Sequence, residues 1–235
     1  MAFSGAYASS AQAYTCPSAP SPVWGCPDTY FGFWEYDGIF NWKPGVSVIG
    51  DSLITGLQAN LANQLTTNGF WGHTYSVPGS AYYHWNNGFN NKEIGQWIAK
   101  QGPKHAVVAL GTNDAAKLAN DPNVTQTEVA NNIAWGMERA WQSVPGCVIV
   151  VGPSRHNVSP ANAQWVRDQM AFRIYTTHDS KPANHRFYWV NWDDISKDHN
   201  DWFNGPNDPH MTDAGKTAYA NMIVWYSKIV DLYGC

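Results

Sequence analysis

The sequence predicts an α/β sandwich of three layers, in which a mainly parallel central sheet lies between two layers of helices. From residue 45 onward, short apolar runs alternate with longer amphipathic stretches, which is the order of strands and helices in this class. One clear run, residues 105–110, is apolar, as expected for a strand buried on both faces. With 235 residues, the chain suits one compact domain that can bury a sizeable core.

Four segments are expected to form the strands of this sheet. They cover residues 46–49, 105–110, 147–151 and 186–192. The first of them ends at Gly50, which favours a turn out of the strand at that point.

The segment after the first strand is expected to form a helix, because leucine recurs every four residues and marks one buried stripe. This stripe consists of Leu53, Leu57, Leu61 and Leu65. A second helix is predicted to run to about Trp141, because Thr125 and Glu128 have the spacing of a capping box.

Two further helices are indicated by the residues at their starts. Ser159 offers an N-cap and Pro160 suits the first helical position, so a helix is expected from there to about Thr177. Thr212 could cap the last helix. The residues of that helix expected to face inward are Ala218, Met222, Val224, Trp225 and Ile229.

Residues 1–42 show no helical or strand period and are expected to pack, as an irregular aromatic-, proline- and cysteine-rich segment, on a domain spanning residues 43–235. The four cysteines form no C-x-x-C pair, so no metal site is expected. Two disulfides fit the even number better than four buried thiols. Their connectivity stays open, with Cys16–Cys26 and Cys147–Cys235 as one reasonable pairing. Structural bridges indicate an oxidising compartment and hence a secreted, extracellular protein.

The composition excludes several classes of partner. A net charge of −4 argues against nucleic acid, whose phosphates require a basic face. No run approaches the roughly 20 apolar residues needed to cross a bilayer, so no transmembrane segment is expected. The 13 Trp and 12 Tyr either fill the core or lie partly exposed and stack on sugars or apolar groups.

Polar residues with catalytic potential follow two predicted strands and precede the last helix. Asp51 and Ser52 come after the first strand, Asn113 and its neighbour Asp114 follow the second, and His210 lies late in the chain. Sites in such sheets gather beyond the carboxyl ends of the strands. A serine hydroxyl needs an imidazole base to become a nucleophile. Taken singly, these residues could equally be helix caps, turn residues and a surface histidine.

Taken together, these segments resemble the SGNH hydrolases, also called GDSL esterases. Residues 48–56, VIGDSLITG, resemble the first block of that family, and residues 107–114, VVALGTND, resemble the third. Residues 210–215, HMTDAG, resemble the last block. Gly79, in the stretch SVPGS, falls where the glycine of the second block is expected. The resemblance covers roughly residues 45–230 and implies a flavodoxin-like sandwich.

The resemblance also implies roles for single residues. Ser52 would be the nucleophile and His210 its base, while an oxyanion hole would be formed by Ser52, Gly79 and Asn113. No metal and no cofactor are expected. Placing Ser52 at a helix start also supplies backbone N–H groups near a developing negative charge.

One position departs from the family pattern. The third member of the triad is normally an aspartate three residues before the histidine, and that position holds Asn207 here, with Asp208 one residue later. Asp208 could orient His210, Asn207 could do so through its amide oxygen, or a backbone carbonyl could assist a dyad. We favour Asp208, because a carboxylate also stabilises the imidazolium that forms.

The expected reaction is hydrolysis of an ester, with an acylated carbohydrate, such as an acetylated polymer, as the favoured substrate. A lipase or acyltransferase acting on lipid esters is the alternative, and a catalytically inactive carbohydrate-binding module is another. Four aromatic residues either line an acyl or sugar pocket or belong to the core. They are Tyr82, Tyr83, Trp85 and Trp202.

Overall fold

The computed structural model describes residues 43–89, 91–100, 102–180 and 186–235. The N-terminal segment 1–42 and the pairing of Cys16 with Cys26, both predicted above, lie outside the described residues.

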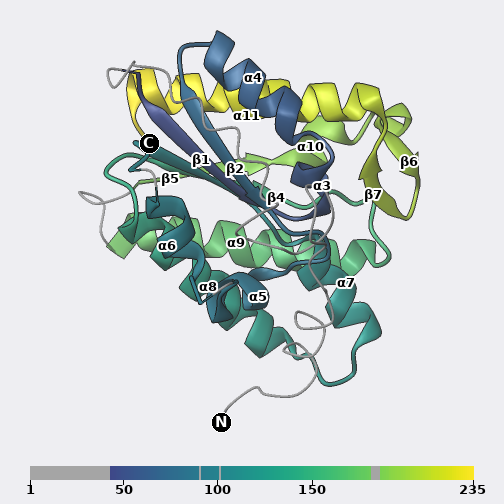
Figure 1. Ribbon diagram of the computed structural model, residues 1–235. Helices are drawn as coiled ribbons and strands as arrows, with labels where there is room; N and C mark the ends of the chain where they lie inside the picture. The colour runs from purple at the N-terminus through teal and green to yellow at the C-terminus, as the bar shows by residue number, and fades with distance from the viewer. Residues whose placement is uncertain (1–42, 90, 101, 181–185) are drawn as a thin grey trace, which may run out of the picture.

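A parallel five-stranded sheet forms the centre of the fold, with the strand order β2-β1-β3-β4-β5 (Figure 1). The strands are β1 (Gly45–Gly50), β2 (Trp71–Ser76), β3 (His105–Ala109), β4 (Val148–Gly152) and β5 (Phe187–Asn191). Every neighbouring pair is parallel. The predicted α/β class and all four predicted strands are confirmed. Strand β2 was not predicted.

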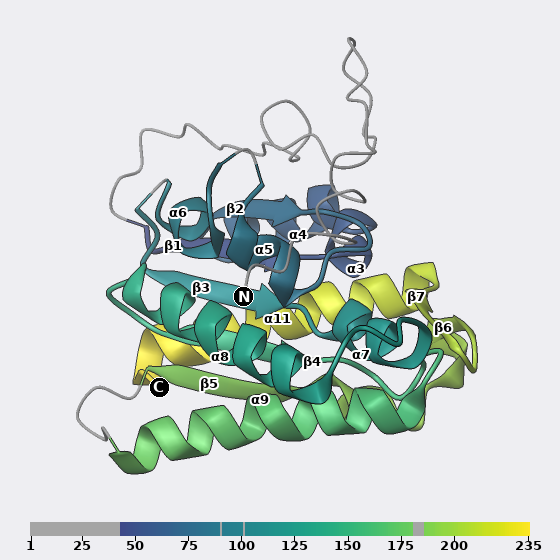
Figure 2. The same cartoon turned by 90° about the horizontal axis from the view of Figure 1, so that it is seen from below.

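Helices cover both faces of the sheet and give the three predicted layers, which are visible from two directions (Figures 1 and 2). One face carries α3 (Ser52–Thr55), α4 (Gln58–Thr67), α10 (Trp192–Ser196) and α11 (Asp213–Tyr233). The other face carries α5 (Tyr82–Asn87), α6 (Ile94–Ala99), α7 (Thr112–Asn120), α8 (Gln126–Gln142) and α9 (Pro160–Ser180). The 3₁₀ turn η2 (Asn200–Trp202) leads into a hairpin of β6 (Phe203–Gly205) and β7 (Asp208–Met211).

Two hydrophobic clusters, one on each face, hold the layers together. Val107 points into the cluster below α4 and α11, whereas its neighbour Val108 points into the cluster below α8 and α9. Successive side chains of a strand point to opposite faces, so an apolar strand serves both clusters.

The leucine stripe is buried as predicted, but it belongs to two helices instead of one. Helix α3 ends at Thr55, and α4 begins at Gln58. Between them, the N–H of Leu57 donates to the carbonyl oxygen of Ile54 at 3.0 Å, a tight turn that breaks the α-helical ladder. The chain therefore changes direction after α3, which stays short at the end of β1.

The predictions for the later helices are confirmed in most respects. Thr125 and Glu128 form the expected capping box of α8, and α9 extends three residues past the predicted end at Thr177. Thr212 caps α11, and Met222 and Val224 are buried there. The inward orientation predicted for Trp225 is wrong, because its position falls outside the buried stripe and 55% of the residue is exposed.

Cys147 and Cys235 form a disulfide, as one of the considered pairings proposed. It joins the residue before β4 to the end of the chain that follows α11. Nearby, Asp231 of α11 accepts hydrogen bonds from Lys104 Nζ at 2.6 Å and pairs with His105 Nε2 at 3.2 Å. None of the helices within the described parts of the chain is long and apolar enough to cross a membrane.

Candidate active site

The candidate nucleophile lies at the junction of β1 and α3. Asp51 is the N-cap of α3, and its Oδ1 accepts a hydrogen bond from the N–H of Leu53 at 2.9 Å. Ser52 is the first residue of the helix and is half-buried. An N-cap carboxylate satisfies one of the unpaired N–H groups at a helix start. The same residue that begins the helix thus sets the position of Ser52.

Ser52 Oγ lies 3.0 Å from Nε2 of His210, and Nδ1 of the same ring lies 2.7 Å from Oδ1 of Asp208. These atoms form a continuous hydrogen-bonded chain from hydroxyl to imidazole to carboxylate. The side chains of His210 and Asp208 are 52% and 44% exposed, so the group opens to solvent.

Asp208, and not Asn207, contacts the imidazole. The Asp208 carboxylate also accepts a hydrogen bond from the backbone N–H of His210 at 2.9 Å, which fixes it against the ring. Partial burial alone would raise the pKa of Asp208, but the two hydrogen bonds from His210 and the charge of its ring outweigh burial and lower it. Asn207 is exposed in the turn between β6 and β7.

Asn113 lies beside the nucleophile at the start of α7. Its Nδ2 donates to Oδ2 of Asp51 at 3.1 Å and to the carbonyl oxygen of Ser80 at 3.0 Å. An amide nitrogen carries two hydrogens, so both are already used within the chain. The structure therefore brings Asn113 to the site, with both donors directed at protein acceptors.

Gly79 lies in the turn that follows β2, where the N–H of Ser80 donates to the carbonyl oxygen of Val77. It has φ of +73°, a conformation that favours glycine, and no atom lies within 4 Å of the position of an added Cβ. Gly79 is exposed. The N–H groups of Ser52 and Gly79 have no acceptor among the residues that the structure describes.

Two buried carboxyl groups lie next to Asn113: Asp51, which accepts from its side chain, and Asp114, the next residue in the chain. Burial is the main cause that raises the pKa of Asp51 to about 7, against hydrogen bonds from Leu53 and Asn113 that lower it. Burial likewise raises the pKa of Asp114 to about 7, and the negative charge of Asp51 adds to this. The Asp114 carboxylate accepts the N–H of Tyr82 at 3.2 Å. Both groups therefore change charge near neutral pH.

Asp114→Asn is expected to gain stability relative to the wild type as the pH rises from about 4 to about 7. In this window the folded wild type holds a proton on Asp114, with its pKa of about 7, whereas the unfolded chain, with the ordinary value of 3.8, has released it. The Asp114 carboxyl therefore lowers the free energy of unfolding of the wild type as the pH rises. The variant has no carboxyl there and does not lose this stability.

Urea denaturation of both proteins at pH 4 and pH 8 measures the difference. Asp168→Asn, which removes a carboxylate from the exposed surface, serves as the control. A gap between Asp114→Asn and the wild type that does not change with pH would contradict the assigned burial effect.

The four predicted lining residues occupy three different environments. Tyr82 and Trp85 are fully buried in the core, so neither offers surface to a substrate. Tyr83 is half-buried and lines a surface pocket between α5, α7 and α8, together with Asp114. Trp202 is half-buried and stacks between Trp192 and His199, with ring centroids 5.6 Å and 3.8 Å away. Core packing thus accounts for two of the four.

Sequence reasoning missed the contacts that hold Asn113. Asp51 was visible beside Ser52 but was interpreted only as a possible helix cap, and it both caps α3 and accepts from Asn113. Ser80 carries no signal of its own except its place next to Gly79. No cluster of residues able to hold a metal ion occurs within the described residues.

Comparisons with known proteins agree with the fold. No protein-family model matches the sequence, and no curated protein matches it. Solved structures do match, and several of them are ester hydrolases with the same α/β fold. A carbohydrate esterase of family 3 from Talaromyces cellulolyticus aligns with a TM-score of 0.61 and 17% identity, over 80% of this chain and 97% of that one.

Two further structures have related activities in their names. An acetylxylan esterase from Geobacillus stearothermophilus aligns with a TM-score of 0.59 and 13% identity, over 77% of this chain and 92% of the other. The C-terminal catalytic domain of the peptidoglycan O-acetyltransferase A of Streptococcus pneumoniae, with a methylsulfonyl adduct, aligns with a TM-score of 0.52 and 17% identity, over 80% and 95% of the two chains. At these identities the likeness establishes a shared fold.

Proposed function

We propose that the chain is a serine-dependent carboxylic ester hydrolase of the SGNH family, with Ser52 as nucleophile, His210 as general base and Asp208 as the residue that orients His210. One observation carries the proposal: the hydroxyl of Ser52 lies 3.0 Å from one ring nitrogen of His210, while Asp208 binds the other at 2.7 Å. Nucleophile, base and orienting carboxylate within hydrogen-bond reach are the signature of an activated serine.

The reaction proceeds in two acyl-transfer steps. Ser52 Oγ attacks the ester carbonyl carbon while Nε2 of His210 takes the hydroxyl proton, and the carbonyl oxygen becomes an oxyanion. The C–O bond to the alcohol breaks as His210 returns the proton to the leaving oxygen. Water then attacks the acyl-enzyme with His210 again as base, and the acid and free Ser52 are released.

The oxyanion is bound by the N–H groups of Ser52 and Gly79, which have no acceptor among the described residues. Asn113 is the third proposed donor. Because its two hydrogens point to Asp51 and Ser80, Asn113 joins the oxyanion hole only if the substrate oxygen shares or displaces one of these bonds. Loss of one such donor typically costs about 10²–10³ in turnover.

An O-acetyl group on a carbohydrate is the proposed substrate. Two features support it. The catalytic group is open, with half of the His210 side chain exposed, so an acyl group that projects from a polymer can reach Ser52. The chain also shares its fold with a protein named as an acetylxylan esterase and with one named as a peptidoglycan O-acetyltransferase. We further propose secretion, because the Cys147–Cys235 bridge is of a kind that persists in oxidising compartments.

The test is labelling with a fluorophosphonate, followed by p-nitrophenyl esters from acetyl to octanoyl and by acetate release from acetylated xylan. We expect a single label on Ser52, the highest kcat/KM for acetyl, and release of acetate from the polymer. A kcat/KM that rises steadily toward octanoyl would instead indicate a lipid ester. Binding to the polysaccharide with neither labelling nor release would indicate an inactive carbohydrate-binding protein and refute the proposal.

A further inference from the structure

The loop after β4 reaches the same edge of the sheet as the candidate catalytic residues. It comprises residues 154–157, and we call it the bridging loop. Its two last residues are both buried polar side chains, His156 at 5% exposed and Asn157 at 1% exposed. Neither belongs to the proposed triad or oxyanion hole. Buried polar side chains are held by specific hydrogen bonds, so the partners of these two show what the loop does.

His156 contacts the hairpin that carries the proposed acid–base pair. Its ring stacks on Phe203 with centroids 3.9 Å apart and planes 10° apart, and its Nδ1 lies 3.3 Å from the carbonyl oxygen of Gly205. A carbonyl only accepts, so Nδ1 carries the proton. Phe203 and Gly205 belong to β6, where they pair with Met211 and Asp208 of β7.

Asn157 contacts the opposite side of the site. Its Nδ2 donates to the carbonyl oxygen of Thr112 at 3.1 Å, and its Oδ1 accepts from the N–H of Ser159 at 3.3 Å. Thr112 is the first residue of α7 and directly precedes Asn113. Two adjacent residues of one loop therefore hold the hairpin of His210 and the helix of Asn113.

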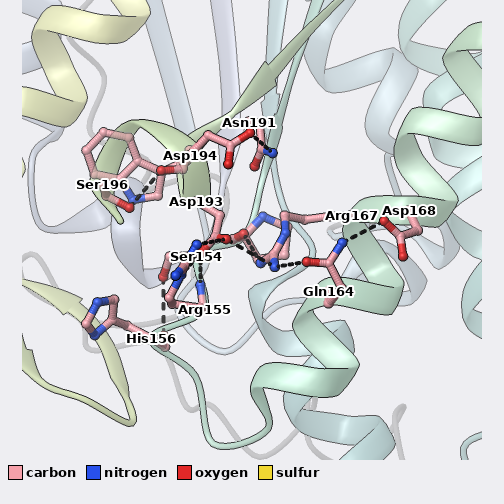
Figure 3. Close-up of polar contacts among 12 residues, drawn as sticks. Ser154, Arg155, His156, Gln164, Arg167, Asp168, Asn191, Asp193, Asp194 and Ser196 are labelled. Atoms are coloured by element: carbon pink, nitrogen blue, oxygen red, sulfur yellow. Dashed lines mark hydrogen bonds and ion pairs between the residues drawn. The ribbon is translucent and has the colours of Figure 1, made fainter. Parts of the chain in front are cut away.

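The start of the bridging loop is fixed by an ion-pair group centred on the buried Asp193 (Figure 3). Asp193, whose side chain is 6% exposed, accepts Nε and Nη2 of Arg155 at 3.0 and 2.9 Å and also pairs with Arg167 at 3.3 Å. Arg167 in turn donates to the carbonyl oxygen of Pro153 at 2.9 Å. Figure 3 shows His156 extending from this group toward the hairpin. Bidentate contacts of this kind restrict the loop to one position.

We infer that the bridging loop sets the position of the Asp208–His210 pair relative to Ser52 and Asn113, with His156 as a positioning residue for catalysis. The inference rests on the proposed function. The hairpin itself has only three and four residues in its strands, and a two-stranded hairpin is marginally stable alone. The location of His210 therefore depends on what packs against the hairpin. His156 provides one of the contacts to β6, where Trp192 also packs against Phe203.

The reach of His210 to Ser52 is sensitive to small displacements. Misplacing a catalytic group by about 1 Å can cost about 100-fold in rate. Loss of the bond between His156 and Gly205 would loosen β6 without removing a group that contacts the substrate. We therefore expect an effect on kcat and little effect on KM.

The experiment compares His156→Phe with the wild type on p-nitrophenyl acetate. Phenylalanine keeps the stacking on Phe203 and removes the bond to Gly205. It also removes Nε2, a buried nitrogen with no partner among the described residues, so the variant should fold. We expect kcat to fall about 10- to 100-fold with KM changed less than about twofold. The proton between His210 Nδ1 and Asp208, followed by NMR, should shift or broaden, which a merely structural residue would not cause.

His199→Phe is the matched control. His199 also stacks face to face on an aromatic ring, that of Trp202, but its side chain is 46% exposed and it contacts neither hairpin strand in the described hydrogen bonds. Its kcat should stay at the wild-type value. Phe203→Leu, which weakens the stacking and keeps the hydrogen bond, provides a second variant. It removes the other part of the contact between His156 and β6 and should also lower kcat.

The outcomes separate this inference from the proposed function. An active wild type with unchanged kcat in folded His156→Phe, or with a raised KM alone, overturns the positioning role and leaves the proposed function intact. A wild type that neither hydrolyses the ester nor reacts with a fluorophosphonate refutes the proposed function itself. If His156→Phe does not fold, an unchanged kcat in Phe203→Leu overturns the positioning role.

Discussion

Replacing Ser52 with alanine is expected to lower kcat/KM toward p-nitrophenyl acetate by about 10⁴- to 10⁶-fold, as in serine hydrolases that lose the nucleophile. The hydroxyl is the only group that can form the acyl-enzyme in the proposed mechanism, and His210 has no proton to take without it. Residual rate above the uncatalysed reaction would come from the N–H groups of the proposed oxyanion hole.

The fold of this variant should be unaffected, because Asp51 and not Ser52 caps α3. Ser143→Ala is the matched control, since that hydroxyl donates to the carbonyl oxygen of Arg139 at the end of α8, outside the site. Circular dichroism and the thermal midpoint establish that both variants fold. A folded Ser52→Ala that keeps more than about one hundredth of the wild-type activity would show that another residue is the nucleophile.

The strands that were easiest to predict are buried on both faces, and their sequences are therefore apolar. Residues 106–109 and 148–151 lie inside the sheet and have apolar side chains toward both faces, so they stand out as apolar runs. Strand β2 was missed because it is an edge strand whose sequence, WGHTYS, contains glycine, histidine and hydroxyl residues. Its identity as a strand comes from pairing with β1, which no local pattern reveals.

The short helices were missed for a related reason. Helices α5 and α6 have six residues each, too few for a periodic pattern to show. They are stabilised by tertiary contacts of large side chains, among them the fully buried Trp85 and Trp97. The same packing explains why Trp85, expected as a possible lining residue, lies in the core.

Only part of the candidate site could be predicted from the sequence, namely the residues that follow strand ends or match a family pattern. Ser52 and His210 are 158 residues apart, so their proximity followed from a family pattern and from the rule that strand ends meet at one edge of the sheet. The hydrogen bonds of Asn113 to Asp51 and Ser80 depend on side-chain rotamers and on a turn after β2. Neither can be inferred from the spacing of residues along the sequence. The choice between Asn207 and Asp208 likewise depends on the path of a hairpin turn.

Asp208→Ala is expected to lower kcat by about 10³- to 10⁴-fold, whereas Asn207→Ala should change it less than about threefold. The Asp208 carboxylate binds Nδ1 of His210 at 2.7 Å, holds the tautomer in which Nε2 can accept the serine proton, and stabilises the imidazolium that follows. Asn207 is exposed in the turn and makes no side-chain hydrogen bond within the described residues. The kcat values for p-nitrophenyl acetate at pH 8 measure both effects.

Asp208→Asn separates the two contributions of the carboxylate. An amide can accept the Nδ1 proton through its oxygen, but it has no charge to stabilise the imidazolium, and it can turn its NH₂ toward the ring and favour the wrong tautomer. We therefore expect Asp208→Asn to lose nearly as much activity as Asp208→Ala. A near-normal Asp208→Asn would mean that orientation alone suffices. Normal activity in both Asp208 variants, with a large loss in Asn207→Ala, would assign the third position to Asn207 despite the observed contact. Near-normal activity in all three variants would leave Ser52 and His210 acting as a dyad.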